Sequence, residues 1–313
     1  MAEMREITSG LEFPEGPIAM DDGSVLVVEI KRGTLTRVLP DGSKKVVAET
    51  GGGPNGAALG PDGKVYICNN GGFEWNVIDG LLIPGHQPHD YQGGSIQRVD
   101  LTTGKVETLY TACDGRRLRG PNDLVFDNAG GFWFTDASKI RERDRDRTGI
   151  FYAKADGSLI KEVVFPMDVP NGIGLSPDGK RLYVAETFTA RVWWWNIAGP
   201  GELIPAPTAG AAILAGPGGG TLLVGLPSYQ LLDSLAVDSA GNVCVATIIN
   251  SGITVISPDG KSLEHVPMSG DPITTNICFG GKDLQTAYVT LSGTGRLVAI
   301  DWPRPGLRLN YAD

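Results

Sequence analysis

The sequence lacks the features that mark membrane-spanning, secreted or zinc-binding chains. No stretch approaches the roughly 18 uninterrupted apolar residues of a membrane helix, and the opening MAEMREITSG has no apolar signal-peptide core. Only four of the 313 residues are cysteines, and they lie far apart with no CxxC pair. Buried free thiols are therefore expected rather than a disulfide framework or a zinc knuckle. These absences predict a soluble cytoplasmic protein.

Positive charge and histidine are scarce as well. Lys and Arg number 27 against 36 Asp and Glu, which gives a net charge of −9 and a pI near 4.9. This excess of acid disfavours nucleic acid or an anionic membrane as a partner. Only three histidines are present, and none accompanies a recognisable GxSxG elbow, so a Ser-His-Asp triad is not expected.

Helical periodicity is almost absent too, and a repeat takes its place. Six segments each begin with a polar anchor, continue as a short apolar run, turn through Gly and Asp, and end in β-branched or aromatic residues; GPNDLVFDNAGGFWFTD (120–136) shows the full pattern. The anchors are Glu15, Asn55, Asn122, Asn171, Asp233 and Asn276. Their spacing, from 40 to 67 residues, suits a four-stranded sheet with loops of variable length.

Six repeats of a four-stranded unit predict an all-β fold, a six-bladed β-propeller in which neighbouring blades protect one another's sheet edges. A β-sandwich is the competing architecture, but it does not require six matching hairpins. Few residues follow Asn276, so we expect the N-terminal segment REITSGLEF to supply the last strand and close the ring. Residues 1–313 then form a single domain, with Trp193 to Trp195 packed between blades.

The anchors point to a metal site. The first strand of each propeller blade lines the central channel, so the six anchors should converge on the axis. Two are carboxylates and four are asparagines, which offer oxygen ligands without sulfur or imidazole. Such a set suits one hard divalent cation, Ca²⁺ before Mg²⁺ or Mn²⁺, with Zn²⁺ a weaker fit. The alternative is a polar ring that only binds channel water.

The repeated segments also resemble a known family. EGP at Glu15, PNDLVFD at Asn122, NGIGLSPDGKRLYVAET at Asn171 and DSLAVDSAGNVCVAT at Asp233 are together similar to the regucalcin, or senescence-marker-protein/gluconolactonase, group of six-bladed propellers. The resemblance covers nearly the whole chain. It implies an axial divalent cation held by Glu15, Asn171 and Asp233, with Asn122 facing water or substrate at the metal.

That family usually opens lactone rings, so the resemblance implies a gluconolactonase-like, metal-dependent hydrolase with a small-molecule lactone as its substrate. A bound cation polarises the lactone carbonyl and activates water. Asp233 is the candidate general base, and Asn122 is the second candidate catalytic residue. Sugar-lactone members carry an Arg two residues before the Asn that Asn122 matches, whereas here Gly120 has that position and Arg119 precedes it. This departure disfavours a plain sugar lactone.

A second regularity comes from the repeat itself. Fourteen residues after five of the anchors, and fifteen after Asn171, lie further polar residues: Glu29, Asn69, Asp136, Glu186, Thr247 and Thr290. Since a hairpin returns to its starting end, these should form an outer polar ring on the anchors' face. We expect Glu29, Asp136 and Glu186 to orient the metal ligands or to line the substrate rim. The alternative is a set of strand-end turn residues.

Two insertions follow a second strand on the same face, at residues 71–94 and 138–149. Loops on a rigid scaffold commonly carry specificity, so these should wall the pocket. The first insertion supplies the aromatic and imidazole side chains Phe73, Trp75, His86, His89 and Tyr91. We expect Trp75 and His89, together with Asn55, to contact a substrate that is bulkier or less polar than a sugar lactone.

Two other functions fit the same residues. Related propellers of the diisopropylfluorophosphatase type hydrolyse organophosphates at a similar metal ring, and there Asp233 would attack phosphorus directly. A non-catalytic calcium-binding propeller would hold the cation without turnover. In each case a monomer or a small homo-oligomer is expected.

Overall fold

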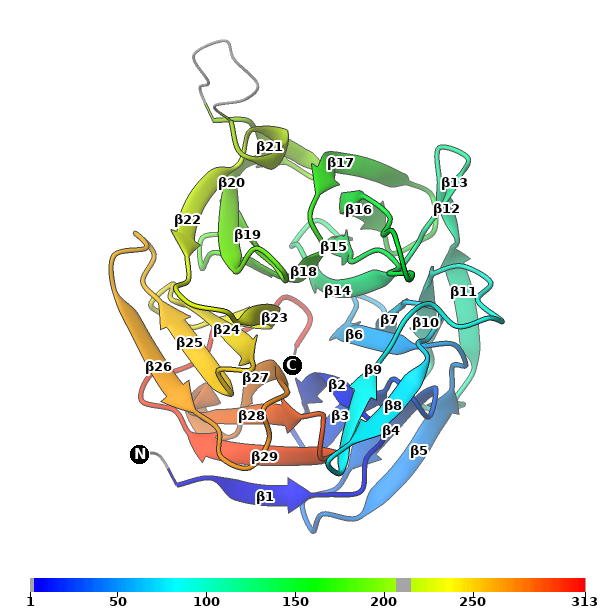
Figure 1. Cartoon of the computed structure of the whole chain (residues 1–313), viewed down its shortest axis with the longest axis vertical. Coiled ribbons are helices and arrows are strands. Elements are labelled where there is room, and N and C mark those ends of the chain that lie inside the picture. Colours follow the sequence, from blue (N-terminus) through cyan, green and yellow to red (C-terminus); the bar gives the residue numbers. More distant parts are fainter. Residues whose placement is uncertain (1–2, 207–214, 313) are drawn as a thin grey trace.

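The structure, a computed structural model, describes residues 3–206 and 215–312. These residues form an all-β ring of antiparallel sheets, the six-bladed β-propeller that the repeat predicts (Figure 1). The helical segments of the described residues are two 3₁₀ turns, η2 (Pro217–Gly219) and η3 (Lys282–Leu284). In this part of the chain no helix is long and apolar enough to span a membrane.

The first three blades have four strands each. Blade 1 contains β2 (Pro14–Ala19), β3 (Val25–Glu29), β4 (Thr34–Val38) and β5 (Lys44–Glu49). Blade 2 contains β6 (Pro54–Leu59), β7 (Val65–Asn69), β10 (Ser95–Val99) and β11 (Val106–Tyr110). Blade 3 contains β14 (Pro121–Phe126), β15 (Gly131–Asp136), β16 (Thr148–Lys154) and β17 (Ile160–Met167).

Blade 4 departs from the four-strand pattern, because two short strands share its outer edge. It contains β18 (Pro170–Leu175), β19 (Arg181–Glu186), β20 (Arg191–Gly199), β21 (Glu202–Ile204) and β22 (Thr221–Gly225), and both β21 and β22 pair with β20. Blade 5 is regular, with β23 (Leu231–Val237), β24 (Val243–Ile248), β25 (Gly252–Ile256) and β26 (Leu263–Pro267).

Both ends of the chain build blade 6. It contains β27 (Thr274–Gly280), β28 (Thr286–Leu291) and β29 (Arg296–Asp301), and β1 (Arg5–Thr8) pairs antiparallel with β29. Arg5 lies opposite Ala299 in this pair. The expected N-terminal strand therefore completes the last blade and fastens the first repeat to the sixth (Figure 1).

The hydrophobic core lies between the blades. Six clusters of buried apolar side chains each join neighbouring sheets; Val28 of blade 1, for example, packs in one cluster with Ile67 of blade 2. Trp195 shares a cluster with Trp133 of blade 3, whereas Trp194 packs against the cluster that joins blades 4 and 5. This confirms the expected packing of the tryptophan run, which follows from the alternation of side chains along a strand.

The two faces of the ring differ. The inner strands β2, β6, β14, β18, β23 and β27 all begin on one face, here called the anchor face. Residues 71–94 form the β8 (Trp75–Ile78) and β9 (Leu81–Pro84) hairpin on this face, which lies over blade 1 and reaches blade 6, where Leu82 N donates to Gly293 O at 2.8 Å (Figure 1). A smaller hairpin, β12 (Ala112–Cys113) and β13 (Arg116–Arg117), precedes blade 3.

The opposite face is crossed by the last residues of the chain. After β29, Trp302 N donates to Gln285 O at 2.8 Å in blade 6. Leu307 N then donates to Val237 O in blade 5 at 3.1 Å, and Asn310 Nδ2 to Phe126 O in blade 3 at 2.9 Å. Residues 302–312, the tail, therefore span this face, here called the tail face, and end near the centre of the ring (Figure 1).

Candidate metal and active site

All six anchors lie where the inner strands begin. Glu15, Asn55, Asn122 and Asn171 are each the second residue of their strand, and Asp233 and Asn276 are each the third. Every inner strand contacts its two neighbours around the axis. Asp233 is half-buried and the other five anchors are buried. The anchors therefore share one layer of the channel at the anchor face, here called the inner ring.

Each inner strand breaks its pairing register at or beside its anchor. Such irregularities bend a strand and re-aim its side chains. Glycines after the anchors let adjacent strands approach closely: a Cβ on Gly56 would lie 2.5 Å from Asn122 O, and one on Gly172 would lie 2.5 Å from Leu235 N. The Asn-Gly pairs of the repeat are therefore required by the close approach of the inner strands as well as by local turn chemistry.

Hydrogen bonds orient the inner ring but leave some of its oxygens unused. Glu15 Oε2 accepts from Asn276 Nδ2 at 2.6 Å, and Asn171 Nδ2 donates to Thr187 Oγ1 at 3.1 Å. Within the described residues, the buried oxygens Glu15 Oε1, Asn122 Oδ1 and Asn171 Oδ1 have no hydrogen-bond partner. Buried polar atoms without a partner are rare because they cost free energy. Three of them in one layer indicate a place where a bound group supplies the missing interaction.

Three acidic side chains crowd the same layer. Burial raises the pKa of Glu15 to about 7, although the hydrogen bond from Asn276 opposes the shift. Burial and the charge of Glu15 raise the pKa of Asp123 to about 8. The same two causes hold the pKa of Asp233 well above its ordinary value. A cation beside these carboxyls would favour their charged forms and offset their mutual repulsion.

Asp123 was not among the residues expected from the sequence. It is 7% exposed, follows Asn122 directly, and its Oδ1 accepts from Leu124 N at 2.9 Å. A signal was available, because Gly16, Gly56 and Gly172 stand at the equivalent place after other anchors. A carboxyl in place of a glycine puts a further acid into the channel.

The donor set of the inner ring fits a hard divalent cation. Glu15 and Asp233 offer carboxylate oxygens, while Asn122 and Asn171 offer amide oxygens, and such oxygen ligands suit Ca²⁺, Mg²⁺ or Mn²⁺. Residues 3–206 and 215–312 contain no group of three or more His, Cys, Asp or Glu that is placed to hold a metal. The six anchors thus bring together carboxylate and amide oxygens, with no thiolate or imidazole among them.

Asp136 and Glu186 of the outer polar ring accept hydrogen bonds from the loops that precede the anchors. Asp136 accepts from Arg119 N and Gly120 N, both at 2.7 Å, just before Asn122. Glu186 Oε1 accepts from Asp168 N at 3.0 Å, three residues before the next anchor. Asp136 is 1% and Glu186 3% exposed. Both carboxylates therefore point into the protein, where Asp136 accepts from backbone amides and Glu186 Oε2 accepts from the Thr189 and Trp193 side chains.

The same type of hydrogen bond, from a loop N–H group to an outer-ring side chain, occurs in blades 1 and 2. Glu29 Oε2 accepts from Glu12 N at 2.7 Å, and Asn69 Oδ1 accepts from Gly53 N at 2.9 Å. Blade 5 differs, since Thr247 Oγ1 donates to Gly252 O at 3.0 Å.

In blade 6 the residue that accepts the backbone N–H groups of the loops is not the one that the count from the anchors predicts. Thr290 Oγ1 lies 2.8 Å from Thr275 Oγ1. Asp271 instead accepts from Ile273 N at 2.7 Å and from Thr294 N at 2.6 Å. Because Asp271 lies before its anchor rather than after it, a fixed spacing could not find it.

The first insertion places aromatic side chains on the anchor face. Trp75 lies with its ring centroid 5.2 Å from that of Phe13, two residues before Glu15. Phe13 forms an apolar cluster with Ile30 of blade 1 and Ile273, which precedes blade 6, and Trp75 packs against it. His89 is exposed in the segment after β9. The structure thus brings Trp75 against Phe13, just before the strand that carries Glu15, and leaves His89 exposed in the loop.

A buried lysine joins the two insertions. Lys139 is 1% exposed, and its Nζ donates to Gly72 O at 2.5 Å and to Asn70 Oδ1 at 3.3 Å. The same Nζ lies 4.1 Å from the centroid of the Phe73 ring. Burial lowers the pKa of Lys139 to about 7. In the sequence this lysine lies next to RERDRDR (141–147), a mixed-charge run that is typical of solvated loops. Its burial was therefore not predicted.

Comparison with protein families matches residues 13–293 to the SMP-30/Gluconolactonase/LRE-like region. Among curated proteins, the chain is similar to a gluconolactonase of Zymomonas mobilis, at 25% identity over 311 residues, which cover 91% of this chain and 78% of that protein. It is also similar to a lactonase drp35 of Staphylococcus saprophyticus, at 27% identity over 265 residues, which cover 83% of this chain and 71% of the relative.

Solved structures share the fold. A gluconolactonase from Xanthomonas campestris superposes with a TM-score of 0.74 at 22% identity, over 96% of this chain and 90% of that one. A calcium-binding protein, regucalcin, from Agrobacterium tumefaciens superposes with a TM-score of 0.70 at 17% identity, over 98% of both chains. At these identities the likeness supports the architecture alone.

Proposed function

Because the chain belongs to the SMP-30/Gluconolactonase/LRE-like region family, we propose that it is a lactonase, a hydrolase of cyclic carboxylic esters, with the inner ring as its active site. Curated relatives that are named gluconolactonase and lactonase support this reaction class. Its partner is then a small-molecule lactone, and the product is a hydroxy acid.

One observation carries the metal dependence of this proposal. Glu15 Oε1, Asn122 Oδ1 and Asn171 Oδ1 are buried oxygens of the inner ring without a partner among the described residues. The half-buried carboxyl of Asp233 interacts with Glu15 and Asn171 in the same layer. Glu15, Asn171 and Asp233 are the proposed ligands of one divalent cation, Ca²⁺ first, with Mg²⁺, Mn²⁺ and Zn²⁺ as the alternatives to test.

When bound, the cation supplies a Lewis acid for the lactone carbonyl and lowers the pKa of water beside it. Asp233, the most exposed member of the inner ring, is the proposed general base that takes the proton of the attacking water. Asn122 presents its free amide oxygen to the same layer and orients the reacting groups. Asn55, the anchor of the neighbouring blade, is the proposed substrate contact beside it.

The anchor face favours a substrate with apolar substituents. Trp75 and the cluster around Phe13 offer apolar surface two residues from an inner-ring anchor. Further large apolar side chains are exposed at strand ends on this face: Phe188 after β19 and Ile249 after β24. His89 is exposed in the segment after β9 and is the proposed contact for the distal part of a bulky lactone.

Asp136 and Glu186 enter the proposal as positioning residues. Their carboxylates accept backbone N–H groups of the loops before Asn122 and Asn171. They would fix the two asparagines at the axis without touching the substrate, because supporting hydrogen bonds orient the groups that bind a metal.

The proposal is tested by a hydrolysis screen over sugar lactones, aliphatic and aromatic lactones, and a phosphotriester. Protein treated with a chelator is given Ca²⁺, Mg²⁺, Mn²⁺ or Zn²⁺, and acid release is followed for wild type, Asp233→Asn and the exposed control Asp301→Asn. We expect cation-restored lactone opening that is lost in Asp233→Asn and kept in Asp301→Asn. Turnover of the phosphotriester alone, or cation binding without any turnover, would overturn the lactonase proposal.

A further inference from the structure

A cavity fills the central channel between the inner ring and the tail. Its volume is about 380 Å³, within the roughly 300–1,000 Å³ range of small-molecule sites. Asn276 and Asp123 line its inner end, and Leu307, Arg308 and Leu309 of the tail line its outer end. The cavity therefore shares a wall with the inner ring but opens on the tail face, and the proposed lactone hydrolysis does not use it.

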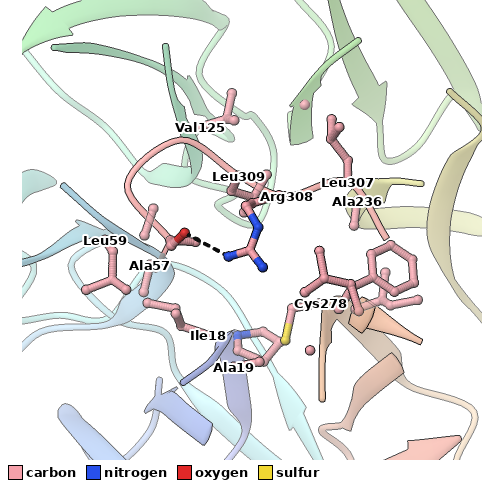
Figure 2. Close-up of a pocket in the computed structure, with 18 of the residues that line it drawn as sticks. Ile18, Ala19, Ala57, Leu59, Val125, Ala236, Cys278, Leu307, Arg308 and Leu309 are labelled. Carbon is pink, nitrogen blue, oxygen red and sulfur yellow. Dashed lines mark hydrogen bonds between the residues drawn. The ribbon is translucent and has the colours of Figure 1, made fainter. Parts of the chain in front are cut away.

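The wall of this cavity is mostly apolar. Each blade contributes an aliphatic side chain from its inner strand: Ile18, Leu59, Val125, Ile173, Leu235 and Ile277. Figure 2 shows Leu307 and Leu309 of the tail on the side opposite Ile18 and Ala19. Water gains few hydrogen bonds from such a wall, so the cavity suits a ligand with a hydrocarbon body.

The charged residues of the lining are unevenly placed. Asp123 lies at the inner end, whereas Asp21, Lys282 and Arg308 follow strand ends or lie in the tail at the outer end. Figure 2 shows Arg308 extending from the tail into the middle of the lining residues. Within the described residues, its hydrogen bond is from Nη1 to Ala312 O, at 3.5 Å. A guanidinium has five N–H donors arranged to bind a carboxylate, and the other donors of Arg308 have no partner among the described residues.

We infer that this cavity binds an aliphatic monocarboxylate, with the carboxylate on Arg308 and the hydrocarbon chain inside the channel. The aliphatic wall of the cavity and Arg308 at its outer end favour this class of ligand. A second anionic group would be carried into the aliphatic part of the channel, away from Arg308, and a cationic head would meet Arg308 and Lys282. A neutral chain of the same length would lose the charge-assisted hydrogen bonds.

Matched eight-carbon probes test this selection. Octanoate, octan-1-ol and suberate, which is the dicarboxylate, are titrated calorimetrically into chelator-treated full-length protein, so that a cation in the inner ring cannot contribute. We expect saturable binding of one octanoate per chain, with octan-1-ol and suberate each weaker by about tenfold or more. No saturable octanoate binding, or equal affinity for the three probes, would overturn the inference.

Two variants locate the carboxylate and the chain. Arg308→Gln should weaken octanoate binding about tenfold while leaving the octan-1-ol affinity unchanged, because it removes only the charge-assisted contact. Ala57→Phe should fill the channel and abolish binding of both probes, with folding checked by circular dichroism. Arg143→Gln, at an exposed arginine on the anchor face, is the matched control and should bind octanoate as wild type does. Unchanged octanoate affinity in Arg308→Gln or in folded Ala57→Phe would contradict the site.

A cysteine offers a second readout that needs no change to the cavity. Cys278 lines the cavity and is partly exposed, whereas Cys68, Cys113 and Cys244 are buried. Labelling by N-ethylmaleimide in alkaline buffer is followed by mass spectrometry, with Cys278→Ser as the control for site. Octanoate at ten times its dissociation constant should slow labelling of Cys278 about tenfold. An unchanged labelling rate would place octanoate elsewhere and overturn the inference.

Discussion

The inner and outer rings both contain carboxylate and amide side chains, one strand apart on the same face, but these side chains differ in their hydrogen bonding. Both oxygens of Asp136 accept backbone N–H groups. Glu15 and Asn171 each keep an oxygen without a partner among the described residues. A buried polar group with its partners stabilises the fold, and one without them destabilises it until a ligand binds. The outer-ring residues therefore stabilise the fold, whereas the inner-ring residues form the candidate site.

The largest expected effect is a loss of activity without a loss of stability. Asp233→Asn removes the proposed base, so the rate of lactone opening should fall at least about hundredfold. The same substitution removes one of three crowded acids, so the free energy of unfolding of the cation-free protein should stay the same or rise. Initial rates and urea unfolding of one preparation measure both. Retained activity with lower stability would reverse the assignment of inner and outer rings.

The converse is expected for the outer ring. Asp136→Asn weakens three charge-assisted hydrogen bonds from backbone amides, those of Arg119, Gly120 and Ser138, which should cost about 2 kcal/mol of unfolding free energy. The activity per folded molecule should fall far less than in Asp233→Asn. Urea unfolding of Asp136→Asn is compared with that of Asp301→Asn, whose carboxylate is exposed. Equal stability of the two variants would mean that the Asp136 hydrogen bonds do not support the fold.

A smaller effect on selectivity is expected from the first insertion. Trp75→Ala should lower kcat/KM for an aromatic lactone about tenfold and change that for a small sugar lactone much less, because only the larger substrate reaches the apolar surface. Val77→Ala is the matched control, since Val77 lies in the same hairpin with 71% of its surface exposed. A parallel loss on both substrates would assign Trp75 to folding rather than to substrate choice.

The last expected effect is a dependence of the unfolding free energy on pH that comes from Lys139. Its pKa falls from 10.5 to about 7 on folding, so between these values the unfolded chain binds more protons than the folded one. The wild type should therefore gain stability as pH rises through this window, by up to about 1.4 kcal/mol per pH unit. Lys139→Met should lack this gain. Unfolding of both proteins across the window measures the difference, and identical slopes would contradict the burial of a titrating amine.

Much of the fold was predictable because each blade is a local repeat. The turns, the alternating apolar residues and the six anchors recur in the sequence, and Asn122 could be placed at a strand start from its own segment. The outer ring was also found by counting, since a hairpin of constant length returns Asp136 to the anchor face. Neither inference required knowledge of contacts between distant segments.

What the sequence did not reveal depends on such distant contacts. The count could place Glu186 on the right face but could not show that it accepts an N–H group from the loop before Asn171. Lys139 is buried because two insertions meet, and the tail places Arg308 at the channel only by crossing three blades. Segments brought together by the ring leave no periodic pattern in either partner.

The proposed cation site is tested most directly by thermal unfolding of chelator-treated protein with and without a saturating divalent cation. Binding only to the folded state adds about 2.7 kcal/mol at a cation concentration of 100 times the dissociation constant. We expect the cation to raise the Tm of wild type and of Asp136→Asn, and to leave the Tm of Glu15→Gln unchanged. An equal rise in Glu15→Gln, or no rise in wild type, would show that the inner ring does not hold the cation.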